Sequence, residues 1–536
     1  MPPEPISFLE HIIKNRRITS SFTLDDTIEP LLTNNLEVTE DRVRSLHRQI
    51  EALKSELKAE ETKIFWINKA LAPIRRLNRD VLFELFKHYI QLHEHERIIR
   101  EQDPHPRYAR LHERLPPIIL LSHICASWRE VVHSTPELWS QIRTTTAGRS
   151  HELEILSMHL ERSGITPLDM VLETAKHGSM RDAFLPLLAE SSSRLRSLGL
   201  HVSIGDLICL FQCIDFDWPS LTRIDISLSS DHYHYGQSHP EGIWMDLRNA
   251  PKLNALTVFV PPEFDPEMEI YDSLYPPSSI TTLQLMHGCT HPSSICRIMS
   301  LCPLLQKCTI AVPDFPNPLE PEHLGLHNDP ITLPYLTHLE IQFCDPFGCP
   351  EILDVFEFPA LRSLVLFHNN ASRRSLRREL FSHLSRFQER SSFNLIWFSV
   401  YQITQIDTAD IVRFLDRVPS LEDLVISHCK IDIHSFCDWM TVKKEFVIIS
   451  PALYRMKILD EPYGWHMEGL GSDRDKVVLE MVKSRAVDHD DLGSLRLGGG
   501  IGLGGYEKKL REDVWRELQL LGEEGTVPFR MLAHNA

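Results

Sequence analysis

The chain has 536 residues, of which 42% are hydrophobic, and a formal net charge of −18 at pH 7. This composition supports a sizeable core or a long repeat array and argues against wholesale disorder. The acidic excess disfavours nucleic acid and anionic membranes as partners, because both require clustered lysines and arginines.

We expect residues 1–35 to form an N-terminal segment without fixed structure. They contain no apolar run long enough for a secretory signal, and no stretch of 18 apolar residues occurs along the chain. We therefore expect a cytoplasmic or nuclear protein that is not associated with a membrane.

The cysteines favour reduced thiols and no cofactor. None of the eleven forms a CxxC pair; Cys209 and Cys213 are four residues apart, and Cys344 and Cys349 five apart. A zinc site is the alternative interpretation, but zinc ligand pairs usually lie closer together. For a chain without a secretion signal, reduced thiols without a metal are the simpler interpretation.

Residues 36–72 predict a coiled-coil helix. Apolar residues recur three and four positions apart, charged residues flank them, and only Glu60 breaks the series. The seam consists of Val43, Leu46, Ile50, Leu53, Leu57, Ile64, Ile67 and Leu71. Pro73 ends the helix. Two interpretations stay open, namely self-association through residues 43–71 and packing of the helix on its own protein.

Residues 74–142 predict a second helical region with a polar insert at 91–115. The insert contains the histidines His93, His95, His105 and His112. Their spacing is irregular and an HExxH pattern is absent, so a solvated loop is a simpler interpretation than a metal site. Apolar residues at helical spacing resume after the insert, and Thr135, followed by a proline, marks one more short turn.

Three motifs in this region carry a family resemblance. They are LNRDVLFELF from Leu77, ICASW from Ile124 and STPELW from Ser134. Together they resemble the F-box pattern Leu-Pro-x-Glu-[Ile/Val]-Leu-x-x-[Ile/Leu]-Phe, [Val/Ile]-Cys-x-x-Trp and a late Leu-Trp. The region is most similar to the fungal F-box-like proteins, in which a helix often precedes the box. Asn78 replaces the usual proline, Asp80 replaces the usual glutamate, and the insert is long.

The resemblance implies an all-α domain that docks on a Skp-type adaptor. The chain would then be the substrate receptor of an SCF-type cullin-RING ubiquitin ligase, and it would hold a target protein without catalysing a reaction itself. The implied adaptor-binding residues, some of which must instead hold the box together, are Leu77, Val81, Leu82, Leu85, Ile124, Trp128, Leu138 and Trp139.

Residues 150–465 predict a leucine-rich-repeat horseshoe solenoid with a parallel sheet, so the whole chain is of the α/β class. A unit of the form Pro-x-Leu-x-x-Leu-x-Leu recurs ten times, and amphipathic runs such as GDLICLFQCI and ADIVRFLDRV lie between copies. The first apolar positions are 195, 221, 253, 280, 305, 336, 361, 393, 421 and 453. Three copies also match the longer leucine-rich pattern, with Cys344, Asn369 or Cys429 at the ninth place. We expect Cys344 and Cys429 to be small buried side chains at the turn after a strand.

The alternation within each copy predicts a surface. If positions one, four and six of a copy face the core, positions three and five face the inner wall. Residues at these positions include Arg223, Asp225, Thr282, Gln284, His338, Glu340, Asp423, Arg455 and Lys457. This wall is either a solvated face or a concave surface that binds the target protein.

Residues 466–536 predict a helical and glycine-rich tail. Gly500, Gly502 and Gly505 satisfy GxGxxG, but too little chain follows for a dinucleotide-binding unit, so a glycine linker is the better interpretation. The arginines between 373 and 378 predict a solvated helix face or an interaction patch. No hydrolase or P-loop motif occurs, and we expect no enzyme. The alternative to the receptor is a non-catalytic leucine-rich-repeat scaffold with a degenerate F-box, assembled through the helix at 43–71.

Overall fold

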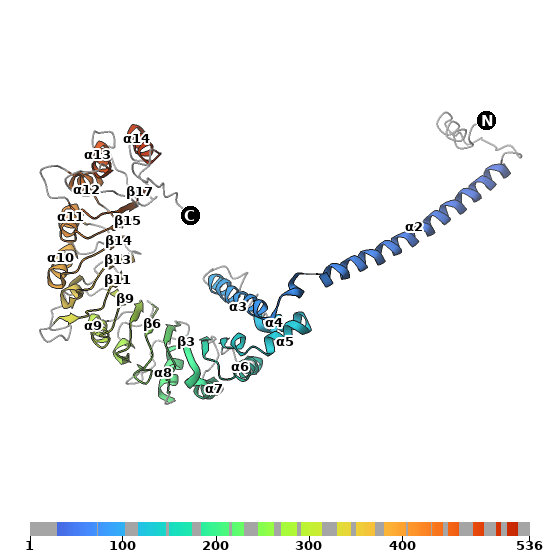
Figure 1. Ribbon diagram of the computed structural model, residues 1–536, viewed down its shortest axis with the longest axis horizontal. Coiled ribbons are helices and arrows are strands. Elements are labelled where there is room, and N and C mark those ends of the chain that lie inside the picture. The colour runs from blue at the N-terminus through green and yellow to red at the C-terminus, as the bar shows by residue number, and fades with distance from the viewer. Residues whose placement is uncertain are drawn as a thin grey trace, which may run out of the picture. The chain divides into compact units, whose positions relative to one another are not determined.

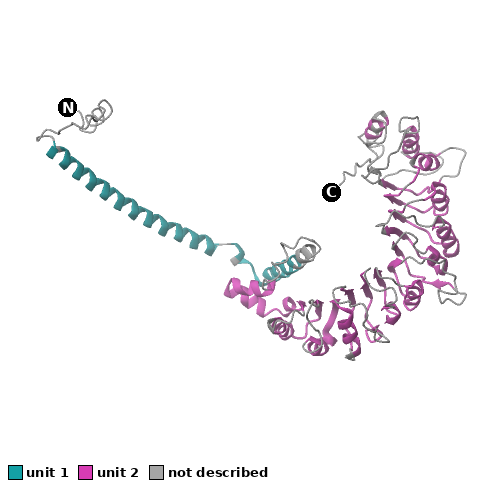
Figure 2. Cartoon of the chain, turned by 180° about the vertical axis from the view of Figure 1, so that it is seen from behind, with its two compact units in different colours: residues 1–104 teal, residues 105–536 magenta. Residues whose placement is uncertain are grey.

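The computed structural model gives a mixed α/β chain (Figure 1). It divides into two compact units, residues 1–104 and residues 105–536 (Figure 2). The structure describes residues 29–71, 73–101, 116–145, 150–173, 184–213, 217–229, 245–261, 270–286, 291–312, 330–344, 350–369, 380–403, 406–429, 431–442, 449–459, 475–486, 500–504 and 512–523.

The first unit is helical. It contains α2 (Glu29–Leu71), the 3-10 turn η1 (Pro73–Arg76) and α3 (Arg79–Glu101). Helix α2 ends two residues before Pro73, as the sequence predicts, but it begins at Glu29, so the prediction of an unstructured segment is wrong for residues 29–35.

The predicted insert is helical over its first part. Helix α3 continues to Glu101, whereas a loop was expected from residue 91. The residues from 91 to 103 are mainly Gln, Leu, Glu, Arg and Ile, which favour helices, and no glycine or proline interrupts them before Pro104. The rest of the insert, with His105 and His112, lies outside the described residues.

The described part of the second unit begins with three short helical elements. They are α4 (Pro117–Ile124), α5 (Ala126–His133) and the 3-10 turn η3 (Pro136–Trp139). Cys125 has an extended backbone, with φ −159° and ψ 169°, and it separates α4 from α5. Pro136 begins the last turn as predicted from the sequence.

In the described ranges an open sheet of 13 parallel strands follows, and its strands lie beside one another in chain order. The strands are β1 (Gln141–Thr145), β2 (Leu168–Glu173), β3 (Leu195–Val202), β4 (Arg223–Leu228), β6 (Ala255–Phe259), β8 (Thr282–Met286), β9 (Lys307–Val312), β11 (His338–Cys344), β13 (Ser363–Asn369), β14 (Trp397–Tyr401), β15 (Asp423–Ser427), β16 (Arg455–Leu459) and β17 (Gly500–Gly504). Two further pairs are short, β5 (Met245–Asp246) with β7 (Leu274–Tyr275) and β10 (Ile331–Thr332) with β12 (Phe356–Glu357).

Helices return the chain from one strand to the next. They are α6 (Ser150–Arg162), α7 (Phe184–Ser191), η4 (Ser192–Arg194), α8 (Ile204–Cys213), η6 (Ile270–Ser273), α9 (Pro292–Ser300), η8 (Pro350–Val355), α10 (Leu380–Ser391), α11 (Thr408–Asp416), α12 (Ile433–Met440), α13 (Asp475–Ala486) and α14 (Glu512–Glu523). Within this unit the strands line the inner, concave side and the helices cover the outer side (Figure 1).

The core lies between the sheet and these helices, where the leucine spacing predicts it. In the copy around β11, Leu336, Leu339 and Ile341 are fully buried. In nine of the ten predicted copies, positions one, four and six are buried in the same way. The copy predicted at residue 393 is shifted by two residues, because Trp397 pairs with Ser363 and Leu395 therefore occupies the first core position.

The predicted glycine linker is a strand. Ile501 pairs with Met456 and Leu503 with Ile458, so β17 extends the sheet beyond β16. Glycine has a low strand propensity, but its backbone N–H and C=O groups pair like any others, and this pairing decides the structure here. Strand β1, before residue 150, likewise extends the sheet beyond its predicted bounds. Residues 373–378 lie outside the described residues.

Buried and half-buried arginines bridge neighbouring repeats on the helical side. Arg297 donates to the carbonyls of Tyr271 and Asp272, at 2.7 and 2.9 Å. Arg194, Arg390 and Arg485 likewise donate to backbone carbonyls of the preceding turn or helix. Each guanidinium therefore satisfies acceptors that the irregular turns leave without a backbone donor.

Candidate functional site

Asn78 caps helix α3. The backbone N–H of Val81 donates to Oδ1 of Asn78 at 2.9 Å, which is the hydrogen bond of an N-cap residue. Asp80 lies in the first turn, where its negative charge interacts favourably with the helix dipole. The two departures from the F-box pattern are therefore compatible with a stable N-terminus of helix α3.

Helix α3 carries two apolar stripes. Leu82, Phe86 and Ile90 are buried. Val81 and Leu85 are 44% and 46% exposed, and Tyr89 and Leu92 continue this exposed stripe. A helix with a buried and an exposed apolar stripe has one face for the fold and one that is open to a partner.

Trp139, in the STPELW motif, joins η3 to the first helix after it. Its Nε1–H donates to the carbonyl of Val132 at 2.8 Å. Its ring makes an edge contact with His159 at 5.1 Å and lies 4.6 Å from the guanidinium of Arg162. The backbone carbonyl of Trp139 also lies 3.2 Å from Nδ1 of His159. Trp139 is thus a core residue that fixes η3 against α5 and α6.

The eight implied adaptor-binding residues fall into three groups. Val81, Leu85 and Ile124 are exposed, Ile124 to 59%. Leu77 and Trp128 are half-buried. The remaining three, Leu82, Leu138 and Trp139, are 4% exposed or less, so they are among the members of the set that hold the fold together.

The nine predicted inner-wall residues lie on the strands as expected. Arg223, Gln284, His338 and Glu340 are exposed, and the other five are half-buried. Cross-strand register aligns them in two rows, one through Arg223, Thr282, His338, Asp423 and Arg455, and one through Asp225, Gln284, Glu340 and Lys457.

Much of the charge on this wall is compensated within it. Arg223 pairs with Asp225 at 2.6 Å and Arg455 with Asp423 at 3.2 Å. The hydrogen bond with Asp225 raises the pKa of Arg223. A wall whose charges pair internally does not select a partner by one sign of charge.

A third row escaped the sequence reasoning. Position seven of each copy also faces the inner wall, since the alternation continues to the end of the strand. In the copies whose side chain at this position is described, it is occupied by His201, Ser227, Phe259, Met286, Ala311, Gln342, Phe367, Tyr401 and Ser427. The rings of Phe367 and Tyr401 lie 6.5 Å apart. Extending each copy by one position would have found this more apolar row.

A shallow depression of about 210 Å³ opens on the wall between β8 and β13. Thr282, Gln284, Lys307, Thr309, His338 and Glu340 line it. It is smaller than the ~300 to 1,000 Å³ typical of small-molecule sites. Its size suits one side chain of a protein partner better than a cofactor.

The thiols in the repeats have structural roles. Burial raises the pKa of Cys296, Cys302, Cys429 and Cys437 to about 12, so they stay protonated and weakly nucleophilic at pH 7. Cys429 is buried after β15, at the predicted turn. The side chains of Cys344 and Asn369 lie outside the described residues. Among those described, no group of three or more His, Cys, Asp or Glu residues could hold a metal ion.

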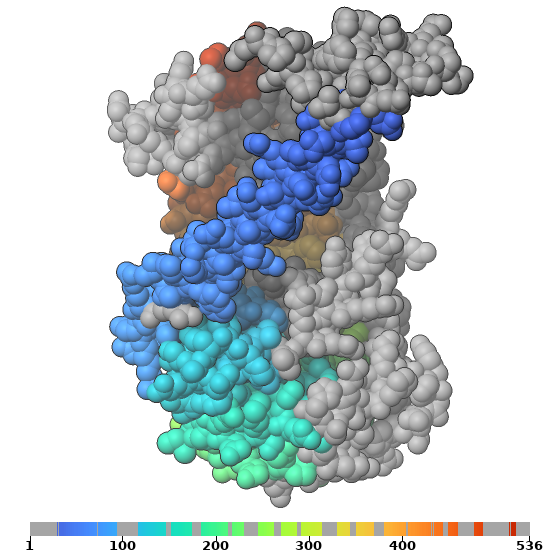
Figure 3. Space-filling model, turned by 90° about the vertical axis from the view of Figure 1, so that its right-hand side faces the viewer, coloured from blue at the N-terminus to red at the C-terminus, as the bar shows by residue number. Residues whose placement is uncertain are grey.

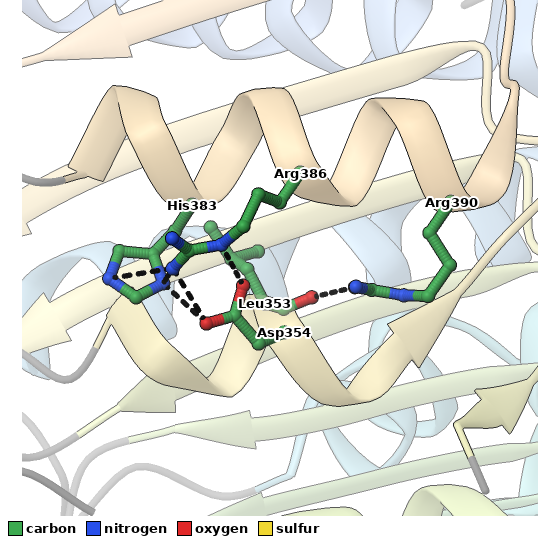
Figure 4. Close-up of polar contacts among 5 residues, drawn as sticks. All are labelled: Leu353, Asp354, His383, Arg386 and Arg390. Carbon is green, nitrogen blue, oxygen red and sulfur yellow. Dashed lines mark hydrogen bonds and ion pairs between the residues drawn. The ribbon is translucent and has the colours of Figure 1, made fainter.

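Figure 4 shows a charged cluster on the helical side. Asp354, in η8, accepts hydrogen bonds from His383 at 2.7 Å and from Arg386 at 2.9 Å, both in α10. Burial alone would raise the pKa of Asp354, but these hydrogen bonds outweigh it and lower the pKa. Arg390, in the same helix, donates to the carbonyl of Leu353 at 2.6 Å. The cluster therefore holds η8 against α10.

No protein-family model matches the chain, and no curated protein matches it significantly. No helix in the described ranges is both long and apolar enough to cross a membrane.

Proposed function

We propose that the chain is a substrate receptor of an SCF-type cullin-RING ubiquitin ligase. The observation that carries the proposal is the exposed apolar stripe of α3, with Val81 and Leu85, inside the segment whose motifs resemble an F-box. Ile124, the first residue of the ICASW motif, is a further exposed apolar residue. A Skp-type adaptor would bury these side chains, and the cullin-RING ligase would follow through the adaptor.

The repeats form the target-binding part of this receptor. Their parallel strands, leucine spacing and outer helices support a leucine-rich-repeat horseshoe solenoid. The polar rows, the apolar third row and the shallow depression support a protein target on the concave wall. By holding a target lysine near the ligase, such a receptor raises its effective concentration and performs no bond chemistry itself.

The test is a pull-down of a purified Skp-type adaptor with the full chain. Val81→Asp with Leu85→Asp should abolish binding, because two buried charges would have no partners in the interface. Leu304→Asp is the matched control, since Leu304 is exposed to 46%, as Leu85 is, but lies in the repeats. Far-UV circular dichroism checks that each variant folds. Equal binding by the double variant and the control would refute docking through α3.

The alternative is a non-catalytic scaffold whose box no longer binds the adaptor. The replacements at Asn78 and Asp80 favour it, since these positions depart from the family pattern. Failure of the unmodified chain to bind the adaptor at micromolar concentrations would select the scaffold over the receptor.

A further inference from the structure

Helix α2 carries an uncovered apolar seam. Its a positions are Leu36, Val43, Ile50, Leu57, Ile64 and Leu71, and its d positions are Leu32, Thr39, Leu46, Leu53, Glu60 and Ile67. From Leu36 to Leu71, the aliphatic side chains of this seam are 45 to 64% exposed. Figure 3 shows the surface of α2, in blue, facing the viewer along its length.

The width and length of this seam fit another helix. The helix has 43 residues, which corresponds to about 65 Å. Six successive a positions are aliphatic, and the rest of the helix is largely charged or polar. A narrow a/d stripe of this kind is the contact surface of a two-stranded coiled coil.

We propose that α2 pairs with α2 of a second copy of the chain as an antiparallel coiled coil centred on Arg48. In this register Leu46 packs against Ile50 of the second copy, and Val43 packs against Leu53. Further out, the layers pair Thr39 with Leu57, Leu36 with Glu60, and Leu32 with Ile64. Each layer occurs twice because the dimer has two-fold symmetry.

Charge complementarity selects this register. In an antiparallel coiled coil, g positions face g positions and e positions face e positions. Arg42 then faces Glu56 of the second copy, and Glu40 faces Lys54. Arg42 and Glu56 have no ion pair in the described part of the chain, whereas Glu40 and Lys54 contact only neighbours on their own helix, Arg44 at 3.6 Å and Glu51 at 2.8 Å.

A parallel dimer lacks these attractions. There, each g position faces the e position five residues further along the second copy. Glu56 would face Glu61, and Glu60 would lie against Glu60 of the second copy inside the seam. Both contacts bring like charges together, so the sequence of α2 favours the antiparallel arrangement.

The first experiment measures the oligomeric state of the full chain by sedimentation over a range of concentrations. A dimer of twice the 62.0 kDa chain mass is expected. Leu46→Glu with Leu53→Glu should give a monomer, because it places charges in the seam. Ser45→Glu with Ser55→Glu adds the same charges outside the seam and should remain dimeric. A monomeric unmodified chain, a larger oligomer, or a dimer that survives the seam variant would overturn the proposal.

The second experiment tests the orientation. Arg42→Glu should weaken dimerisation about tenfold, since two surface ion pairs become repulsive, and adding Glu56→Arg should restore it. Mixing Val43→Cys chains with Leu53→Cys chains should give a disulfide that joins positions 43 and 53, identified by mass spectrometry of the linked peptides. Val43→Cys alone should not cross-link, because position 43 of one chain and position 43 of the second copy lie about 15 Å apart along the axis of the coiled coil. A disulfide joining position 43 to itself would establish a parallel pair and refute the register.

This dimer does not depend on adaptor binding. The seam variants leave Val81 and Leu85 unchanged, so loss of the dimer and loss of adaptor binding are separate results.

Discussion

Replacing Arg485 with methionine (Arg485→Met) should loosen the last repeats. Arg485 is 2% exposed, and it donates to the carbonyls of Met440 at 2.8 Å and Ile449 at 2.7 Å, with a longer contact to Ser450 at 3.4 Å. Burial lowers the pKa of its guanidinium to about 10, so it remains charged at pH 7.

The expected loss follows from the two short hydrogen bonds. The buried carbonyl of Met440 and the part-buried carbonyl of Ile449 would each lose a donor, at about 1 to 3 kcal/mol apiece. Methionine fills much of the volume and removes the cost of burying a charge, which offsets part of this loss. We expect a net loss of about 3 kcal/mol in the free energy of local unfolding, which corresponds to on the order of 100-fold faster amide exchange.

The loss of local stability should be confined to α12, α13 and the turn before β16, because each repeat contacts only the neighbouring repeats. Hydrogen exchange read by mass spectrometry measures it segment by segment. Arg417→Met is the control, since Arg417 pairs with Glu389 at the surface and such pairs contribute about 1 kcal/mol or less. Unchanged exchange in these segments, or a loss that spreads equally to β1, would refute the reasoning.

Three further predictions concern titratable groups. Burial lowers the pKa of His159, so as the pH falls the unfolded chain binds a proton at this histidine before the folded chain does. The free energy of unfolding should therefore fall from pH 7 to pH 5.5, by at most about 1.4 kcal/mol per pH unit. In thermal melts, His159→Gln should flatten this slope. The pKa of Asp354 is lowered, so the stabilisation of the fold by its carboxylate is present above pH ~4 and is lost below it. Asp354→Asn should therefore melt at a lower temperature than the unmodified chain at pH 6 and at the same temperature at pH 2. Because burial raises the pKa of Cys296 and Cys302 to about 12, alkylation of the native protein at pH 8 should modify half-buried Cys125 and Cys209 before these two thiols. Rapid modification of Cys296 would contradict this order.

The strand register was predictable because burial penalises a slip. A shift of one residue would move every leucine of a copy to the wrong face, so the spacing of Leu221, Ile224 and Ile226 fixes the orientation of β4. The prediction for the copy at 393 was wrong because Phe393 and Leu395 are both buried and both fit the first core position. Strand β17 was missed because its pairing with β16 depends on backbone groups that no side-chain pattern reveals.

The site was harder to predict than the fold. Val81 and Leu82 are adjacent and both apolar, as are Leu85 and Phe86, so the pattern shows a broad apolar face without its outward side. Positions one apart on a helix lie about 100° apart, and only the surroundings decide which of the two is buried. Leu82 and Phe86 are buried while Val81 and Leu85 are exposed.

The two tryptophans of the F-box-like segment have different roles for the same reason. Trp128 is half-buried in α5, whereas Trp139 is buried at the start of the sheet. Immediately after Trp139, the carbonyl of Ser140 accepts a hydrogen bond from Asp169 of β2 at 3.0 Å. The end of the F-box-like segment and the first strands therefore share one core. In the proposed receptor, this continuity would hold α4 and α5 in a fixed position relative to the concave wall, so that a target bound there would keep a constant distance from the adaptor-binding side chain of Ile124.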